Sequence, residues 1–210
     1  MRKLLFPLSV AAFIIGMVGY SFAQDANPLS TNLAADTKAA SPSHLVTYKD
    51  PTYGFALTSP QGWSSITPNK ISELTRGAFK PTPDTLIFVV NDADPDQNIN
   101  IQFAGDARGD APTNTLARQF LEQMRTQLPI FAKQQMSATF LSSTIVDLAG
   151  GVALVMITTS NRGSTVMKQK SITLIVNGKA FTITCTAREA TYINADRAGF
   201  QPILASLTFK

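Results

Sequence analysis

The 210-residue chain has very little of the side chains from which most catalytic and metal sites are built. It contains one cysteine, Cys185, and one histidine, His44. A single cysteine cannot form an internal disulfide, so the fold must be stabilised by its core alone. A single histidine at the edge of the folded region excludes a multi-histidine metal site and leaves no imidazole for a Ser-His-Asp triad. We expect Cys185, in an alternating apolar stretch, to be a small buried hydrophobe rather than a reactive thiol.

The chain also lacks the short motifs that mark common catalytic and nucleotide sites. It has no Gly-x-Ser-x-Gly elbow, no Ser-x-x-Lys pair and no glycine-rich phosphate loop. Oxygen side chains alternate between Asp92 and Asn98 at a spacing similar to that of a calcium loop. An EF-hand loop needs glycine at its sixth position and glutamate at its twelfth, where this chain has Gln97 and Phe103. We therefore predict a solvated hairpin loop there, and no metal or cofactor site.

Two further classes of function find little support. A hydrolase that uses Asp92, Asp94 and Asp106 is conceivable, but nothing in the sequence brings two of these carboxylates to a common reaction centre. We therefore predict no catalytic residues and a protein that is not an enzyme. The chain has 18 basic and 14 acidic residues, and no dense Lys/Arg run with interleaved aromatics. We expect no nucleic-acid partner.

The first residues have the pattern of an export signal. Arg2 and Lys3 precede an almost wholly apolar stretch, residues 4–18, and Ser21-Phe22-Ala23 supplies the small residues of a signal-peptidase site. The stretch is shorter than the roughly 20 residues of a membrane-spanning helix, so we favour cleavage over an anchor. No cysteine nearby could carry a lipid. We predict a signal peptide at residues 1–23 and a periplasmic or secreted protein that spans no membrane after cleavage.

Two segments follow the leader. Residues 24–43 are rich in Ala, Asn, Ser, Thr, Asp and Pro without an apolar period, a composition that predicts a flexible linker. Residues 44–210 have the length of one ordinary domain and show no internal repeat. We predict a single domain over this range.

Within that range, alternating apolar residues and turn signals predict a series of hairpins. The strands expected are 44–48 with 54–58, 85–90 with 98–103, then 139–146, 151–158, 166–176 and 180–185, and a short terminal strand at 206–209. Asn177-Gly178 is the strongest turn signal, typical of a type I′ turn. One amphipathic helix is expected around residues 116–128, ended by Pro129, and a second at 194–205. The pattern predicts an α+β fold with a mainly antiparallel β-sheet flanked by helices.

Three motifs in this order resemble the PsbP-like fold family. They are the opening Tyr48-Lys-Asp-Pro-Thr-Tyr-Gly-Phe-Ala-Leu-Thr-Ser-Pro-Gln-Gly-Trp63, a central Gly150-Gly-Val-Ala153, and the closing Phe200-Gln-Pro-Ile-Leu-Ala-Ser-Leu-Thr-Phe209. The family includes an extrinsic photosystem subunit, bacterial PsbP/DcrB-type envelope proteins and a nuclear-import factor. The resemblance implies a PsbP-like α/β sandwich over about residues 45–210. It implies no catalytic residues, because the family shares none, and the positions matched here are structural aromatics and glycines rather than metal ligands.

Aromatic residues of the opening motif are the candidate contact residues. We name Tyr53 and Trp63 as possible partner contacts, because aromatic side chains supply large contact areas. The competing interpretation, which we favour for Phe55 and Trp63, is that these rings pack the sheet against its first helix or loop. Lys168 and Lys170 fall on one side of a predicted strand, where we expect a solvated face.

The sequence therefore favours an exported, non-enzymatic accessory or binding protein. It would act through protein–protein contacts with an envelope protein or complex that the sequence does not identify. The alternative is a carrier of a small apolar ligand, held in a pocket between the sheet and its helices.

Overall fold

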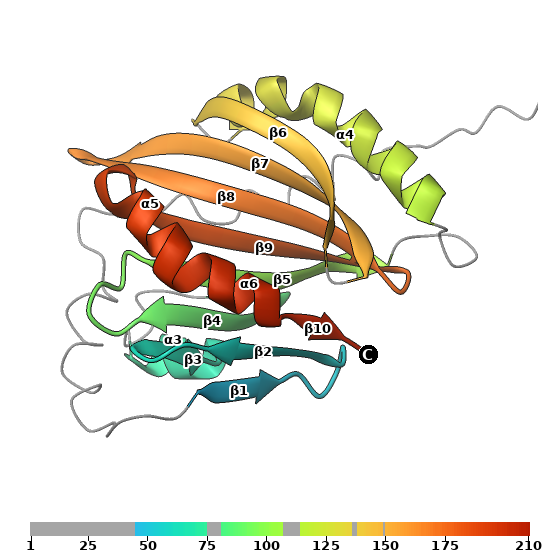
Figure 1. Cartoon of the computed structure of the whole chain (residues 1–210). Coiled ribbons are helices and arrows are strands. Elements are labelled where there is room, and N and C mark those ends of the chain that lie inside the picture. The colour runs from blue at the N-terminus through green and yellow to red at the C-terminus, as the bar shows by residue number, and fades with distance from the viewer. Residues whose placement is uncertain (1–44, 75–80, 107–113, 136–137, 149) are drawn as a thin grey trace, which may run out of the picture.

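The computed structural model describes residues 45–74, 81–106, 114–135, 138–148 and 150–210, which form two antiparallel sheets and several helices (Figure 1). The predicted signal peptide, the predicted linker and His44 lie outside the described residues. The strands are β1 (Val46–Lys49), β2 (Phe55–Ser59), β3 (Trp63–Ile66), β4 (Thr85–Asn91), β5 (Asn98–Asp106), β6 (Thr139–Leu148), β7 (Gly151–Arg162), β8 (Thr165–Val176), β9 (Lys179–Arg188) and β10 (Thr208–Phe209). The helices are α3 (Pro68–Leu74), α4 (Asn114–Gln135), α5 (Tyr192–Ala195) and α6 (Gln201–Ser206).

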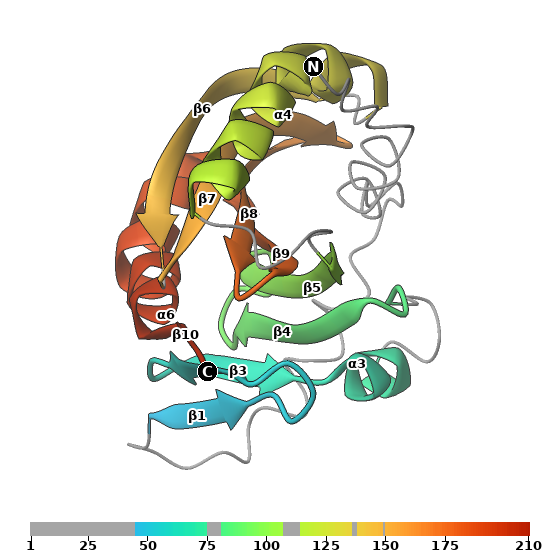
Figure 2. The same cartoon turned by 90° about the vertical axis from the view of Figure 1, so that its right-hand side faces the viewer.

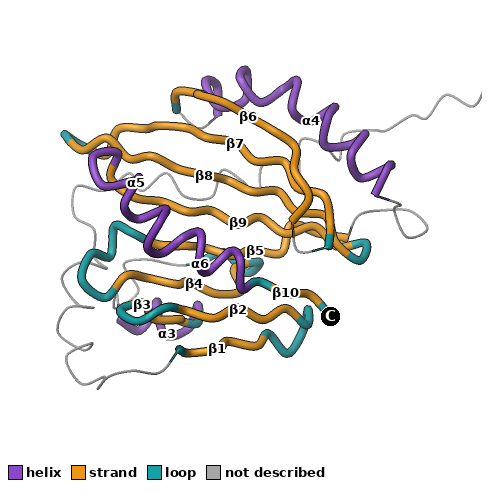
Figure 3. Tube along the Cα trace, viewed as in Figure 1, coloured by secondary structure: helices purple, strands orange, loops and turns teal. Residues whose placement is uncertain are grey.

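The larger sheet has seven strands in the order β3-β4-β5-β9-β8-β7-β6, and every neighbouring pair is antiparallel. Its long strands β7, β8 and β9 are joined by short turns (Figure 3). The turn between β8 and β9 has positive φ angles at Asn177 (51°) and Gly178 (72°), as the type I′ prediction requires. The predicted α+β class, the mainly antiparallel sheet and all the predicted hairpins are confirmed.

One face of this sheet is covered by the C-terminal helical segment, in which a π-helical turn (Asp196–Phe200) joins α5 to α6. Figure 2 shows this segment on the side of the sheet opposite α3. Apolar side chains of the sheet and the helices form the main core there. Its members include Ile99, Ile101, Ile172, Leu174, Phe181 and Ile183 from the sheet, and Tyr192, Ala195, Phe200 and Ile203 from the helical segment.

The opposite face is covered by two separate helices. α4 packs on β6 and β7, where Leu121, Met124 and Leu128 contact a buried apolar cluster with Leu154 and Met156. At the other side of the same face, Ile71 of α3 packs with Ile66, Phe88 and Val90. The central strands β5, β9 and β8 lie between these two apolar zones.

The smaller sheet has the order β1-β2-β10 and continues the main core. Phe55 and Leu57 of β2 are buried in the same cluster as the side chains beneath α5 and α6. The C-terminal strand pairs with β2 through Thr208 opposite Ala56 and Phe209 opposite Phe55. Both ends of the described chain therefore meet in this sheet.

Three elements differ from the sequence-based expectation. β3, which begins at Trp63, and α3, which follows it, were not expected. The prediction that Pro129 ends the central helix is wrong, because α4 continues through Pro129 to Gln135. Proline inside a helix loses one backbone hydrogen bond, but Pro129 lies on the exposed side of α4, where water can bind the carbonyl that is left free.

Candidate binding face

The middle of the sheet face between α3 and α4 is polar. The register places Asn98, Asn100 and Gln102 of β5 beside Thr186, Thr184 and Thr182 of β9, which in turn lie beside Gln169, Ser171 and Thr173 of β8. The residues that alternate with them, such as Ile99, Ile183 and Ile172, point into the main core on the other face. These nine side chains, three from each of three central strands, form what we call the polar patch.

The polar patch has apolar neighbours on both sides. Along one row of the sheet, Phe88 of β4 lies opposite Asn100, and Met156 of β7 lies opposite Ser171. Phe88 belongs to the cluster beneath α3 and Met156 to the cluster beneath α4. The polar patch is therefore bordered by apolar side chains across the strands, and also at one end of β8 and β9, where Ile175 and Ala180 belong to the cluster beneath α4.

Several members of the polar patch are buried, and two of them have unpaired polar atoms. Asn100 is 7% exposed, and Thr173 is fully buried. Asn100 Oδ1 and Thr173 Oγ1 have no hydrogen-bond partner among the described residues. Gln102, by contrast, donates from Nε2 to Thr82 Oγ1 at 3.3 Å. Buried polar atoms in folded proteins are nearly always hydrogen bonded, so the two unpaired oxygens are unusual.

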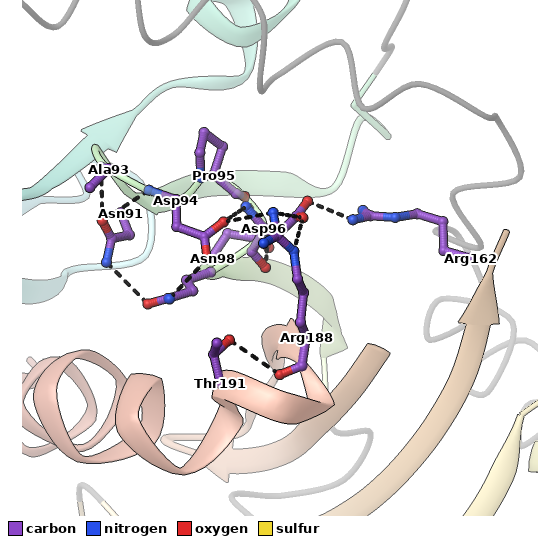
Figure 4. Close-up of polar contacts among 10 residues, drawn as sticks. Asn91, Ala93, Asp94, Pro95, Asp96, Asn98, Arg162, Arg188 and Thr191 are labelled. Carbon is purple, nitrogen blue, oxygen red and sulfur yellow. Dashed lines mark hydrogen bonds and ion pairs between the residues drawn. The ribbon is translucent and has the colours of Figure 1, made fainter. Parts of the chain in front are cut away.

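A cluster of ion pairs lies at one end of the polar patch (Figure 4). Asp96, in the loop between β4 and β5, accepts from Arg162 Nη2 at 2.6 Å and from Arg188 Nε at 2.7 Å. Arg188 Nη2 also lies 3.3 Å from Asp94 Oδ1. The hydrogen bond from Arg188 to Asp96, and then the charges of Asp96 and Asp94, raise the pKa of the Arg188 guanidinium. Two carboxylates and two guanidiniums thus neutralise one another.

These contacts correct the prediction of a solvated loop at Asp92–Asn98. The Asp96 side chain is only 8% exposed. Within the loop, Asn91 Oδ1 accepts from the backbone N–H of Ala93 at 2.9 Å, and Asn98 Nδ2 donates to the Pro95 carbonyl at 3.1 Å. Asp94 and Asp96 therefore pair with arginines, whereas Asp92 Oδ1 is buried without a hydrogen-bond partner among the described residues. No local pattern predicted these contacts, because Arg162 and Arg188 are distant from the loop along the chain.

The carboxylates of the hydrolase hypothesis are not brought together. Asp92 and Asp94 lie in the loop before β5, whereas Asp106 is the last residue of β5 and lies 3.6 Å from Lys179 Nζ. Asn98 and Asp106 are eight residue steps apart along β5, a distance of about 26 Å. Among the described residues, no group of three or more His, Cys, Asp or Glu side chains could hold a metal ion.

The aromatic residues named from the sequence lie away from the polar patch. Trp63 is 7% exposed and contacts Phe200, with 5.7 Å between the ring centroids. It therefore packs on the C-terminal helical segment, not on the first helix or loop as expected. Phe55 is buried in the same core. Tyr53 is half-buried and stacks on Phe103 at 4.4 Å; a partner contact through Tyr53 or Trp63 stays a prediction.

The prediction of a solvated face at Lys168 and Lys170 is wrong, because the helical segment covers that face. Lys170 forms an ion pair with Asp196, and its side chain is 15% exposed. Lys168 Nζ lies 5.2 Å from the centre of the Tyr192 ring. Cys185, paired with Lys170 in the register, is fully buried, as expected. Burial raises the pKa of its thiol to about 12, which keeps the thiol protonated.

The fold is similar to known structures. Cyanobacterial PsbP from Synechocystis sp. PCC 6803 aligns with a TM-score of 0.54 and 16% identity, over 82% of this chain and 96% of that chain. LpqN of Mycobacterium tuberculosis, which is involved in cell envelope biogenesis, aligns with a TM-score of 0.47 and 14% identity, over 80% and 92% of the two chains. PA94 of Pseudomonas aeruginosa, a putative regulator of unknown function, aligns with a TM-score of 0.42 and 14% identity, over 80% and 99%.

No protein-family model and no curated protein matches the sequence. The alignment with cyanobacterial PsbP shows that the chain has a PsbP-like fold, as the three sequence motifs indicated. At this level of identity the similarity concerns the fold and not the activity. In the part of the chain that the structure describes, no helix is long and apolar enough to cross a membrane.

Proposed function

We propose that this protein is an exported, non-enzymatic accessory protein of the cell envelope, and that the polar patch is its recognition surface. The observation that carries this proposal is the burial of Asn100 Oδ1 and Thr173 Oγ1 without a hydrogen-bond partner among the described residues. Leaving a buried polar atom unpaired destabilises a fold by about 1–3 kcal/mol. Both side chains would have to turn outward to receive the missing hydrogen bonds from a partner bound at the polar patch.

The chemistry of the polar patch supports binding rather than catalysis. Its side chains are amides and hydroxyls, which do not change protonation near neutral pH. General acid–base or nucleophilic chemistry would require a base within hydrogen-bond reach of one hydroxyl. The nearest charged groups described above, Arg162 and Arg188 with their carboxylates, are already paired with one another.

Export is supported by the sequence alone. The basic start, the apolar stretch at residues 4–18 and the small residues before position 24 have the order of a cleavable leader. The alternative function, a carrier of a small apolar ligand, has no specific observation in its favour among the described residues. The face beneath α5 and α6 is filled by large buried rings, including Phe181 and Phe200.

Site-specific photo-crosslinking in cells tests the proposal. A photoreactive residue replaces Thr186, a half-buried member of the polar patch, in a copy expressed at its native level. The control places the same residue at Thr144, an exposed threonine of the edge strand β6. We expect a reproducible envelope partner to crosslink from position 186 and not from position 144. Equal capture from both positions, or none from position 186, contradicts the proposal.

A further inference from the structure

We infer that the polar patch binds an uncharged ligand rich in hydroxyl groups, of the chemical class of neutral oligosaccharides. This inference rests on the proposed function, because it names the chemistry that the same surface recognises. Four properties of the polar patch lead to it: the type of its side chains, its charge, its unpaired oxygens and its dimensions.

The side chains can both donate and accept hydrogen bonds. Each threonine or serine hydroxyl and each asparagine or glutamine amide does both. Thr182, Thr184 and Thr186 form a line of hydroxyls along β9, with amides of Asn98, Asn100 and Gln102 on the neighbouring strand. A ligand hydroxyl also donates and accepts, so it can satisfy either kind of side chain. A ligand that only accepts, or only donates, uses only the donor or only the acceptor capacity of these side chains.

The charge of the region excludes an ionic ligand. The polar patch contains no charged side chain, and the adjoining cluster pairs Asp94 and Asp96 with Arg162 and Arg188. An ion that lost its hydration here would find these four charged side chains already paired with one another, and burying an unpaired charge is strongly unfavourable. The ligand is therefore uncharged.

The unpaired oxygens exclude a purely apolar ligand. Asn100 and Thr173 are at least nine-tenths buried, and the register puts both side chains on the face of the polar patch. Asn100 Oδ1 can only accept a hydrogen bond, so its partner must carry an O–H or N–H group. A hydrocarbon placed against these atoms would leave them unsatisfied.

The dimensions favour more than one sugar ring. Adjacent strands lie about 4.8 Å apart, so three strands span about 10 Å. The partly exposed members of the polar patch, Asn98, Gln169, Thr184 and Thr186, lie toward its end next to Arg188, and the other five are buried. Apolar zones beneath α3 and α4 border this area on both sides. A chain of sugars can direct hydroxyl groups toward several side chains of the polar patch at once. The backbone N–H and C=O groups of an extended peptide point sideways, along the edges of the peptide, and not toward the face of the sheet.

Titration of the full chain with defined probes tests the inference. The probes are neutral hexamers of α-1,4-glucose, β-1,3-glucose and N-acetylglucosamine, the acidic hexamer of galacturonate, and an uncharged Ser/Asn-rich peptide. The readout is the side-chain amide signals of Asn98, Asn100 and Gln102 in nuclear magnetic resonance spectra. We expect saturable shifts with at least one neutral hexamer and none with the acidic hexamer.

Matched variants locate the binding. Thr184→Val keeps the shape of the side chain but removes one hydroxyl from the polar patch, and we expect about tenfold weaker binding. Thr186→Val is a second such variant, used if Thr184→Val does not fold. Thr144→Val makes the same change on exposed β6 and should leave affinity unchanged.

Four results overturn the inference: no neutral hexamer binds, the acidic hexamer binds equally well, only the peptide binds, or the folded patch variant keeps its affinity. Failure of this inference is distinguishable from failure of the proposed function. A protein that crosslinks from position 186, without any oligosaccharide binding, would support the recognition surface and reject the glycan. Oligosaccharide binding at the polar patch without a crosslinked protein would support the inference and show that this surface recognises a glycan rather than a protein.

Discussion

Position 199 requires glycine, because the ring of Trp63 occupies the space that a side chain would need. A Cβ atom at this position would overlap Cζ2, Cε2 and Cη2 of the indole. Gly199 lies in the π-helical turn between α5 and α6, and Trp63 starts β3. The contact therefore fixes how closely the helical segment approaches the sheet.

We predict that Gly199→Ala destabilises the protein by about 1–3 kcal/mol, because the added methyl overpacks a filled core. Chemical denaturation followed by circular dichroism measures the change. The same substitution in a Trp63→Leu background should be less harmful, since the smaller side chain makes room. An equal effect in both backgrounds would show that the loss arises from the local backbone and not from the indole.

The Cys185 thiol should make stability depend on alkaline pH. Its folded pKa of about 12 lies above the ordinary value of 9.0, because burial disfavours the thiolate. The folded state keeps the proton where the unfolded state loses it, so this contribution is complete below pH 9 and is lost as the pH rises toward 12. We expect the native protein to lose stability relative to Cys185→Ala between pH 9 and 11. Urea unfolding under reducing conditions measures this; a pH-independent difference contradicts it.

Local patterns predicted Cys185 correctly but failed for the lysines of the neighbouring strand. An alternating apolar stretch identifies a buried cysteine from its own neighbours along the chain. Whether Lys170 is solvated depends on α5, and on Asp196 in the turn after it, which follow much later in the sequence. The exposure of Lys170 is therefore set by packing between segments that are distant in sequence, which a local pattern does not reveal.

At the scale of elements, Pro129 weakens the backbone hydrogen bonding of α4. It lies on the exposed side of this helix. We predict that Pro129→Ala stabilises the protein by about 1–3 kcal/mol, because it restores a hydrogen bond and a better helix former. Thr126→Ala, at another exposed position of α4, is the control and should have a smaller effect. Thermal unfolding measures both; a lower midpoint for Pro129→Ala would show that the proline is needed for the shape of α4.

The hairpins were predictable because each depends on residues close in sequence. Alternation and turn residues define β4 with β5, and Asn177-Gly178 defines the connection of β8 to β9. β3 and α3 were missed because each is short, with four and seven residues, and β3 lacks the apolar alternation that identified the equally short β1. Short segments offer too few residues to establish a period.

At the scale of the whole molecule, the two sheets share one core. Phe55 and Leu57 of the small sheet pack with Phe181 and Ile183 of the large sheet. We predict that the sheets unfold together, because separating them would expose these side chains to water. Native-state hydrogen exchange tests this: amides of β2 and β9 should require the same opening free energy. A lower value for β2 would show that the small sheet opens on its own.

The polar patch could not be predicted from the sequence. Threonines and asparagines alternate with isoleucines along β5 and β9, which for one strand is the ordinary pattern of a half-solvated sheet. The patch exists only because the register aligns three such strands and because α3 and α4 cover the strands on either side. The polar patch therefore results from the pairing of β5, β9 and β8, and not from the composition of any one of these strands.

The pairing of β2 with β10 has a consequence for the order of events during synthesis. Thr58 donates its backbone N–H to Ser206 Oγ, across 148 positions of the chain. After β2 has been synthesised, the ribosome must continue as far as Thr208 before β10, the second strand that pairs with β2, begins. The small sheet therefore stays incomplete until Thr208 and Phe209 of β10 have been added and can pair with β2.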